Sequence, residues 1–273
     1  MADRRSTAPE PGFEDSRDYV QSLARGLAVL RAFDGEHATL TLAAIAARTG
    51  LSRAAARRLV LTLQHLGYVR TLGREYSLSP RVLELGFGCM DSLRLTELVQ
   101  PLVERLAQRV NHSCSMAVLD GQSIVYVLRV PVRRVMTVAL GVGARLPAFA
   151  ASMGRVLLSG LSDADLATWL SRCQPERHTP HTVTDRKRLR RIVDDVRSQG
   201  HCYVEQELEL GLCSLAVPVH DRDGRIVAAL NASMPYHAGA SRHALQEVLP
   251  PLRAAAGAIE RCLPAHCLPP VSP

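Results

Sequence analysis

The period of the hydrophobic pattern changes part-way along the chain. Up to about residue 110 the apolar residues recur mainly at helical spacing, as Leu98, Leu102 and Leu106 do. Beyond this point apolar and polar residues alternate in SCSMAVL and SIVYVLRV, and the Asp120-Gly121 pair between them is typical of a β-hairpin turn. One type of element cannot satisfy both periods. The sequence therefore predicts an α+β chain, with a small helical domain followed by a mixed domain that contains an antiparallel sheet.

Capping residues and glycines divide the first part of the chain into short helices. The first helix ends at Asp34-Gly35. A second helix is expected from Leu42 to Arg48 with Thr41 as its N-cap, and a third from Arg53 to about Leu66 with Ser52 as its N-cap. The run YVRTLGREYSL follows and predicts a short hairpin around a central glycine.

Positive charge is concentrated in this first part. The whole chain has 33 basic and 26 acidic residues, which gives a net charge of +7. Between Arg48 and Arg81 there are seven arginines and one acidic residue, Glu75. This charge density is typical of a surface that binds nucleic-acid phosphates, and arginine can also donate two hydrogen bonds to a base edge.

The order of these elements is that of a winged helix-turn-helix. Small residues on the third helix would let its backbone approach a major groove, where arginine reaches base edges and phosphates. We expect Leu59, Leu63 and Leu66 to bury the opposite face. A solvated basic helix in an ordinary bundle is the alternative interpretation. The residues expected to contact double-stranded DNA are Thr41, Ser52, Arg53, Ala54, Arg57, Arg58 and, at the tip of the wing, Arg74.

Other features exclude several classes of protein. No apolar run reaches the roughly 18–20 residues of a membrane helix, and the N-terminus lacks the apolar core of a signal peptide. The seven cysteines are irregularly spaced without a CxxC pair, which favours free thiols in a reducing compartment. No Walker or GxGxxG motif occurs. We expect a cytoplasmic protein with no membrane contact and no cofactor.

An enzyme remains an alternative for the second part of the chain. Cys202 or Cys213 with His201 or His220 could supply a thiol nucleophile and a base. Both cysteines lie in apolar strand runs, however, which favours buried and inert thiols. We therefore predict no catalytic residues.

A metal site is the other chemical alternative. His178 and His181 form an HxxH pattern near Cys173, and these three side chains could bind a metal ion. The segment is rich in proline and no fourth ligand lies nearby in the sequence. We therefore predict no metal site.

Long stretches of both halves resemble the IclR family of bacterial transcription regulators. In the first half these are QSLARGLAVLRAF, TLAAIAARTGLSRAAARRLVLTLQHLGYV and REYSLSPRVLELG. In the second half RLPAFAASMGRVLLSGL and GLCSLAVPVHDRDGRIVAALNAS are similar to the effector-binding domain of that family. The stretch YVLRVPVRRVMTVALGVGARLPAFAASMGRVLLSG resembles one branch, the PcaR, PobR and PcaU regulators of aromatic-acid catabolism through the β-ketoadipate pathway.

The resemblance covers about residues 18–262 and implies a regulator rather than an enzyme. It implies a winged helix-turn-helix joined by a linker helix to a sensor domain of GAF- or profilin-like fold. The expected organisation is a disordered tail (1–17), the DNA-binding domain (18–79), the linker helix (80–94), the effector-binding domain (95–262) and a second tail (263–273).

We expect the second domain to bind a small carboxylate in a mostly apolar hollow. Arg134 would pair with the acid group, the helix start at Ser152 would offer backbone N–H donors, and Met136 would contact a ring or chain. Protocatechuate, 4-hydroxybenzoate and β-ketoadipate are the expected effectors; glyoxylate or pyruvate would instead indicate an acetate-type regulator. The residues expected to contact the effector are Arg134, Met136, Ala151, Ser152, Met153, Gly154, Cys202, Glu205, Leu215 and Asn231.

A regulator of this kind is expected to act as a dimer, because one recognition helix reads too few base pairs for specificity. The apolar residues Val82, Leu83, Leu85 and Phe87 of the linker form a candidate dimer surface. The family resemblance is also compatible with a tetramer, and an activator would in addition contact RNA polymerase. Two alternatives from other classes are an enzyme acting on a small organic acid and an architectural DNA-binding protein without a ligand.

Overall fold

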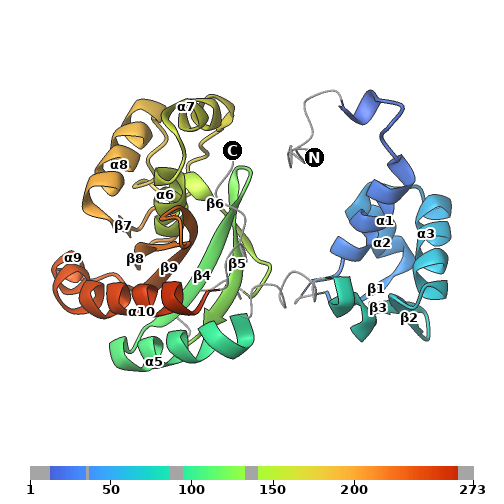
Figure 1. The fold of residues 1–273 in the computed structure, drawn as a ribbon. Coiled ribbons are helices and arrows are strands. Elements are labelled where there is room, and N and C mark those ends of the chain that lie inside the picture. The colour runs from blue at the N-terminus through green and yellow to red at the C-terminus, as the bar shows by residue number, and fades with distance from the viewer. Residues whose placement is uncertain (1–12, 35–36, 86–94, 133–140, 264–273) are drawn as a thin grey trace. The chain divides into compact units, whose positions relative to one another are not determined.

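The computed structural model describes residues 13–34, 37–85, 95–132 and 141–263 (Figure 1). The chain separates into two compact units, residues 1–89 and 90–273. The boundary falls within segment 80–94, for which we predicted a linker helix. Of this segment, residues 80–82 form a short helix, residues 83–85 are helical, and residues 86–94 lie outside the described residues.

The described part of the first unit contains helices α1, α2 and α3 and a small antiparallel sheet whose strands lie in the order β1-β3-β2. The three strands pair in register, with Leu40 opposite Tyr76 and Leu72 opposite Glu75. The elements are η1 (Phe13–Asp15), α1 (Gln21–Arg31), β1 (Thr39–Thr41), α2 (Leu42–Thr49), α3 (Arg53–His65), β2 (Val69–Leu72), β3 (Glu75–Leu78) and η2 (Pro80–Val82).

Local capping determines the turn between α2 and α3. The Thr41 hydroxyl accepts a hydrogen bond from the Ala44 N–H, and the Ser52 hydroxyl accepts one from the Ala55 N–H. These bonds satisfy N–H groups that the first helical turn leaves unpaired. Gly50 ends α2 at φ +66°, a conformation that glycine adopts without steric cost. The two predicted N-caps are confirmed, and they set the tight turn of a helix-turn-helix.

The core-facing stripe of α3 differs in part from the prediction. Ala56, Val60 and Leu63 are buried at the spacing i, i+4, i+7, and Leu59 is half-buried. Leu66 is 48% exposed, so its predicted burial is wrong. The reason is that Leu66 is the C-cap of α3 and lies beyond the last turn that contacts the core.

The second unit is built on one six-stranded antiparallel sheet in the order β6-β5-β4-β9-β8-β7. The β4–β5 turn consists of Gly121 and Gln122, one residue later than predicted, because Asp120 still pairs with Ser123. The elements are η3 (Leu95–Val99), α5 (Gln100–Val110), β4 (Ser113–Asp120), β5 (Ser123–Val130), β6 (Arg145–Pro147), η4 (Ala148–Ala150), α6 (Ser152–Ser159), α7 (Asp163–Arg172), α8 (Arg186–Gln199), β7 (Cys202–Glu205), β8 (Leu212–His220), β9 (Ile226–Pro235), α9 (Ala240–His243), η5 (Ala244–Val248) and α10 (Leu249–Cys262).

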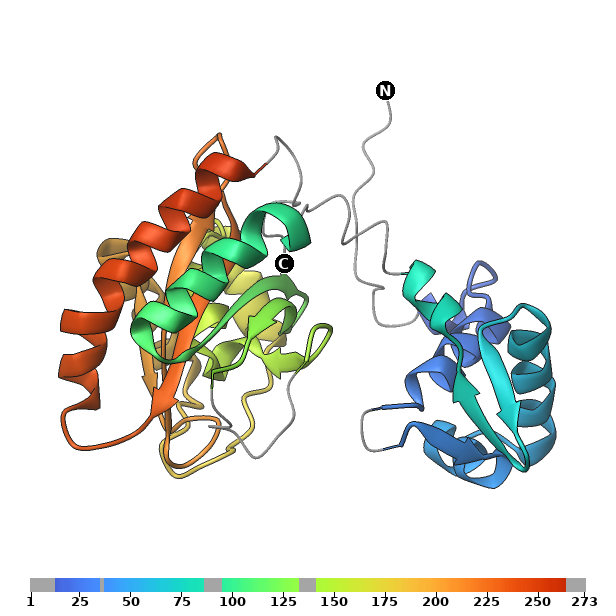
Figure 2. The ribbon, with the colours of Figure 1, turned by 90° about the horizontal axis from the view of Figure 1, so that it is seen from below.

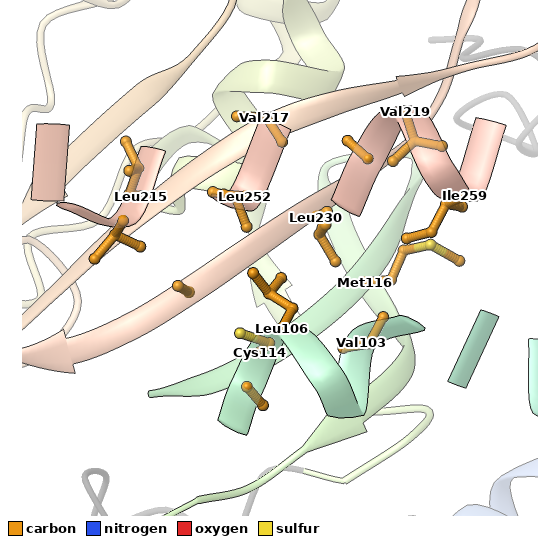
Figure 3. Packing of buried hydrophobic residues seen from close by; sticks show 14 of the residues in the cluster. Val103, Leu106, Cys114, Met116, Leu215, Val217, Val219, Leu230, Leu252 and Ile259 are labelled. Atoms are coloured by element: carbon orange, nitrogen blue, oxygen red, sulfur yellow. The ribbon is translucent and has the colours of Figure 1, made fainter. Parts of the chain in front are cut away.

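Helices cover both faces of this sheet. The neighbouring helices α5 and α10 lie across one face (Figure 2). Helix α6 packs on the other face, and α8 lies against α6 (Figure 1). Each face has its own apolar cluster, and successive residues of β4, β8 and β9 contribute to the two clusters in turn. Figure 3 shows the α5/α10 side, where Leu106, Met116, Leu230 and Ile259 are packed together.

The closing helix is interrupted near its prolines. A π-helical turn, η5, separates α9 from α10, and Pro250 and Pro251 occupy the first positions of α10. Proline is tolerated at a helix start because the N–H group it lacks would be unpaired there.

Candidate nucleic-acid interface and ligand pocket

The outer face of α3 carries unpaired positive charge. Arg53, Arg57 and Arg58 are exposed, and within the described residues none of them forms an ion pair. Ala54 is exposed between them. An arginine held by a carboxylate in the same domain would lose part of its attraction for phosphate, whereas these guanidinium groups are available for DNA.

The wing also presents an exposed arginine. Gly73 adopts φ +62° in the turn between β2 and β3, and Arg74 follows it at the tip. By contrast, the hydroxyl groups of Thr41 and Ser52 already accept backbone hydrogen bonds as N-caps. A capping hydroxyl can still donate to a phosphate oxygen, so the contacts of these two residues with DNA stay predictions.

A small hollow lies in the second unit, between the sheet, the start of α6 and the β7–β8 loop. Its walls combine apolar side chains with hydroxyl, amide and carboxylate groups. The lining residues are Tyr126, Leu146, Ala150, Ala151, Ser152, Met153, Val204, Gln206, Glu207, Leu208, Glu209, Leu212, Cys213, Ser214, Asn231 and Ser233.

The first turn of α6 forms one side of this hollow. Its N-cap residue, Ala151, has no side chain that could accept the N–H groups of the turn. The Ser152 hydroxyl instead lies 2.8 Å from the Ser214 hydroxyl. A helix start without a side-chain cap is a favourable position for an anion, because unpaired N–H groups and the helix dipole both attract negative charge.

Close backbone packing holds α6 in this place. A Cβ atom on Gly154 would lie 2.1 Å from the carbonyl oxygen of Ala148, so only glycine fits there. Gly154 therefore supports the pocket and does not line it.

A row of polar side chains crosses the floor of the sheet on the α6 face. Ser115 on β4 pairs with Arg129 on β5 and with Asn231 on β9. The neighbouring residues Cys114 and Met116 pack on the α5/α10 side, so the row faces α6.

Within the described residues, each member of this row has a buried polar atom without a hydrogen-bond partner: Arg129 Nη1, Ser115 Oγ and Asn231 Oδ1. A buried polar group left unpaired costs about 1–3 kcal/mol. Three such atoms on adjacent strands are therefore the mark of a place built to hold a polar ligand or water.

The remaining groups of the floor are connected to one another. The Asn231 side-chain amide donates to the Ser214 hydroxyl at 2.9 Å and to the Ser233 hydroxyl at 3.1 Å. Burial raises the pKa of Tyr126 to about 12, and the nearby positive charge of Arg129 acts in the opposite direction. Tyr126 therefore presents a neutral phenol to the pocket at physiological pH.

Charge near the pocket is largely compensated. The buried Arg155 guanidinium donates to both carboxylate oxygens of Glu207, with each N–O distance 2.7 Å. The described lining itself contains no cationic side chain. The guanidinium with an unpaired donor on this face of the sheet is that of Arg129.

Four of the predicted effector residues line the hollow: Ala151, Ser152, Met153 and Asn231. Two others are misplaced by the prediction. Leu215 packs in the α5/α10 cluster, and Glu205 lies on the same side, within 3.2 Å of the Tyr203 hydroxyl. Because side chains alternate along a strand, Glu205 and Leu215 face away from the pocket that Val204 and Ser214 line.

The other predicted residues do not reach the hollow within the described residues. Cys202 lies on the α6 face but is buried in the apolar cluster rather than in the pocket wall. Arg134 and Met136 lie outside the described residues.

Sequence reasoning missed Arg129, Ser115, Ser214 and Ser233. The period of two could have found Ser233, which lies two positions from Asn231 on β9, whereas Ser115 and Ser214 lie on other strands and needed the strand register. Arg129 needed the strand register as well, which no local pattern contains.

The two chemical alternatives, a thiol nucleophile and a metal site, find no support in the described residues. Burial raises the pKa of the Cys202 thiol to about 11 and raises that of Cys213 as well, so neither thiol is poised for nucleophilic attack. No group of three or more His, Cys, Asp or Glu residues in the described part of the chain is arranged to hold a metal ion. None of the described helices combines the length and the apolar character needed to cross a membrane.

Comparison with known proteins identifies the class of the chain. Residues 22–73 match the IclR helix-turn-helix domain, and residues 87–261 match the bacterial transcriptional regulator IclR C-terminal domain. The chain belongs to the IclR family of bacterial transcriptional regulators. The proteins similar to this IclR-type chain are transcriptional regulators, so the prediction of a regulator rather than an enzyme is confirmed.

Relatives in the same branch are similar over most of the chain. The Pca regulon regulatory protein of Pseudomonas putida is 44% identical over 222 residues, which cover 81% of this IclR-type chain and 76% of that protein. A putative transcriptional regulator from Rhodococcus sp. RHA1 is 47% identical with a TM-score of 0.77, covering 90% of this chain and 98% of that one. The predicted PcaR, PobR and PcaU branch is confirmed.

One solved structure of the family contains a ligand. An IclR homologue from Microbacterium hydrocarbonoxydans, complexed with 4-hydroxybenzoate, is 29% identical to this IclR-type chain. Its TM-score is 0.78, and the match covers 88% of this chain and 98% of that one.

Proposed function

We propose that this IclR-type regulator controls genes of aromatic-acid catabolism in response to a hydroxylated aromatic acid that binds in the α6 pocket. The observation that carries the proposal is the row of buried, unpartnered polar atoms of Arg129, Ser115 and Asn231 beside the uncapped start of α6. The 4-hydroxybenzoate of the Microbacterium homologue and the Pca role of the Pseudomonas relative support the same class of ligand.

The chemistry of the row matches a ligand with an acid group and a hydroxyl group. The Arg129 guanidinium donates to the carboxylate, and the Ser115 hydroxyl donates a second hydrogen bond. The Asn231 Oδ1 atom needs a donor, which a phenolic hydroxyl supplies. Arg129 and Asn231 lie two strands apart, about 10 Å between backbones, a span that fits one substituted ring. Leu146 and Met153 supply apolar contact.

A thermal-shift screen tests the ligand class. 4-Hydroxybenzoate and protocatechuate should raise the melting temperature by mass action. β-Ketoadipate, glyoxylate and pyruvate should act less, and the neutral 4-hydroxybenzamide should have little effect. Stabilisation by the neutral amide and by no acid would exclude a carboxylate effector. Stronger stabilisation by glyoxylate or pyruvate would instead indicate a regulator of the acetate type.

The proposal places α3 of two protomers in successive major grooves of a near-palindromic operator. Exposed apolar residues of the first unit support self-association. Val20, Leu23 and Leu27 form an outward stripe on α1, and Leu83 and Leu85 are exposed beyond the wing. Water-exposed apolar stripes of this kind are favourable surfaces for a second copy. Phe87 of the predicted dimer surface lies outside the described residues.

Regulation follows from differential binding. The effector must favour one of two dimer arrangements, because a ligand with equal affinity for both would shift neither. We propose that the protein works in the cytoplasm as a dimer or tetramer, and that as an activator it also contacts RNA polymerase. A gel shift on its own upstream DNA with and without 4-hydroxybenzoate tests the coupling between effector and operator.

A further inference from the structure

The β7–β8 loop forms one wall of the ligand pocket. Gln206, Glu207, Leu208 and Glu209 all line the hollow. Gln206 has φ +55°, a conformation that is rare outside glycine and needs support from its surroundings. The support comes from the loop's own bonds: the Gln206 N–H donates to the Leu212 carbonyl, and the Gly211 N–H donates to the Gln206 side chain at 2.9 Å.

A second set of bonds fixes this wall to the turn before α8. The Thr182 hydroxyl donates to the Glu207 carbonyl at 2.6 Å, and the Thr179 hydroxyl donates to the Gln206 carbonyl at 2.6 Å. The Val183 N–H donates to the Glu207 carboxylate at 2.8 Å. One loop residue, Glu207, therefore takes part in backbone and side-chain bonds to the same turn.

The Arg155–Glu207 pair connects the wall to α6. Arg155 donates through both terminal nitrogens to Glu207, and its Nε donates to the Phe149 carbonyl at 2.8 Å. The side chains are only 2% and 8% exposed. Arg155 lies one turn after Ser152 and Met153, which form the opposite wall of the pocket.

We propose that Arg155 and Glu207 are positioning residues for the effector: the pair holds the β7–β8 loop and the first turn of α6 at the separation that fits the ligand. This inference rests on the effector pocket of the proposed function. The pair has a second effect, because Arg155 neutralises a carboxylate in the pocket wall that would otherwise repel an acid. Neither side chain needs to touch the ligand.

A positioning role of the Arg155–Glu207 pair can be distinguished by measurement from a role in stability alone. A buried ion pair replaced by apolar residues of similar size often leaves stability unchanged or higher, because both desolvation penalties disappear. The double variant Arg155→Met/Glu207→Met removes both charges together but leaves the Val183 N–H and the Phe149 carbonyl without these partners. The melting temperature of the unliganded protein should therefore fall, but by less than in either single variant, which buries an unpaired charge. The affinity of the double variant for 4-hydroxybenzoate, measured by calorimetry, should fall about tenfold or more, because the ligand must then order a loosened wall.

Hydrogen exchange tests the same pair without any ligand. The amides of Val183, Gln206 and Leu212 should exchange at least about tenfold faster in the double variant, since the anchor of the loop is gone. Arg155→Lys keeps the positive charge but loses the bidentate contact with Glu207 and the hydrogen bond to the Phe149 carbonyl. Its affinity for 4-hydroxybenzoate and its protection from hydrogen exchange should therefore lie between those of the wild type and the double variant. Arg225→Met, which removes an exposed ion pair at the β8–β9 turn, is the matched control and should change neither.

The outcomes separate this inference from the proposed function. Wild-type affinity together with wild-type exchange in the double variant would overturn the positioning role. Failure of the wild-type protein to bind any aromatic acid would overturn the effector class instead, and the exchange rates would still decide whether the pair holds the wall.

Discussion

Arg129 is the residue on which the proposed recognition of an acid group depends. It is the guanidinium with a buried, unpaired N–H on the α6 face, and it lies opposite Ser115 in the sheet. An arginine in this position is costly without an anion, and that cost is removed when a carboxylate binds. The absence of a protein partner in the described residues is thus the reason why we expect this residue to bind an acid.

Replacement of Arg129 by methionine should abolish stabilisation by 4-hydroxybenzoate. The unliganded protein should stay folded, because methionine keeps the aliphatic part and removes an unpaired donor whose burial costs about 1–3 kcal/mol. Scanning fluorimetry with a ligand titration measures both effects. Arg105→Met on α5, which packs on the opposite face of the sheet, is the control, and an unchanged ligand shift in Arg129→Met would contradict the assignment.

Gly154 gives a second prediction at this scale. Gly154→Ala would drive a Cβ atom into the Ala148 carbonyl, so we expect a loss of about 1–3 kcal/mol in the free energy of unfolding. Gly257→Ala in α10 is the matched control, since only the end of the Arg261 side chain lies near its new Cβ atom. That variant should be stabilised by about 0.5–1 kcal/mol through helix propensity. Equal stabilities in urea would show that α6 can move away from Ala148.

At the scale of elements, we expect α3 and the wing to make different contacts with DNA. Helix α3 presents three unpaired arginines on one surface, whereas the wing presents Arg74 at the tip of a two-stranded hairpin. A helix in the major groove reaches base edges, and a wing lies against the sugar-phosphate backbone or the minor groove.

The two contacts can be separated with a matched pair of variants. Arg57→Ala should weaken operator binding by about 1–3 kcal/mol and relax the preference at one base pair. Arg74→Ala should weaken binding to operator and unrelated DNA by a similar factor and reduce its salt dependence. Fluorescence anisotropy on both DNAs at several salt concentrations measures these changes. A change of base preference in Arg74→Ala, with none in Arg57→Ala, would reverse the assignment.

The sequence predicted these elements best where the signal is local. Thr41 and Ser52 are caps that act within three residues of themselves, and the predictions of both were correct. Glu205 and Leu215 were assigned to the wrong face because the choice of strand ignored the alternation of side chains. The Arg155–Glu207 pair joins residues 52 positions apart and leaves no periodic trace in the sequence. Short strand β6 likewise depends on pairing with β5 rather than on its own three residues.

At the scale of the whole molecule, we expect the exposed apolar residues of α1 to take part in assembly. Val29 of α1 is buried in the domain core, and Leu30 packs against it. Leu23 and Leu27 are 63% and 42% exposed. The helix therefore carries apolar residues on a buried side and on an exposed side, and the exposed side is the one we expect to contact a second copy.

A charge on this stripe should weaken self-association. The double variant Leu23→Glu/Leu27→Glu should shift the sedimentation distribution toward smaller species and lower operator affinity at least about tenfold, because each half-site is then bound separately. Leu245→Glu replaces an exposed leucine of the sensor unit and serves as the control. Unchanged sedimentation in the α1 variant would assign assembly to other surfaces.

The alternation of the two clusters along β9 bears on how such regulators diversify. Leu230, Ala232 and Met234 belong to the α5/α10 side, while Asn231 and Ser233 belong to the pocket. A substitution at one of the pocket positions changes the groups that face the ligand and leaves the packing of the α5/α10 face intact. Descendants of one ancestral gene can thus acquire new inducers through point mutations without losing a foldable scaffold, which makes this strand a natural target for evolving sensors of other acids.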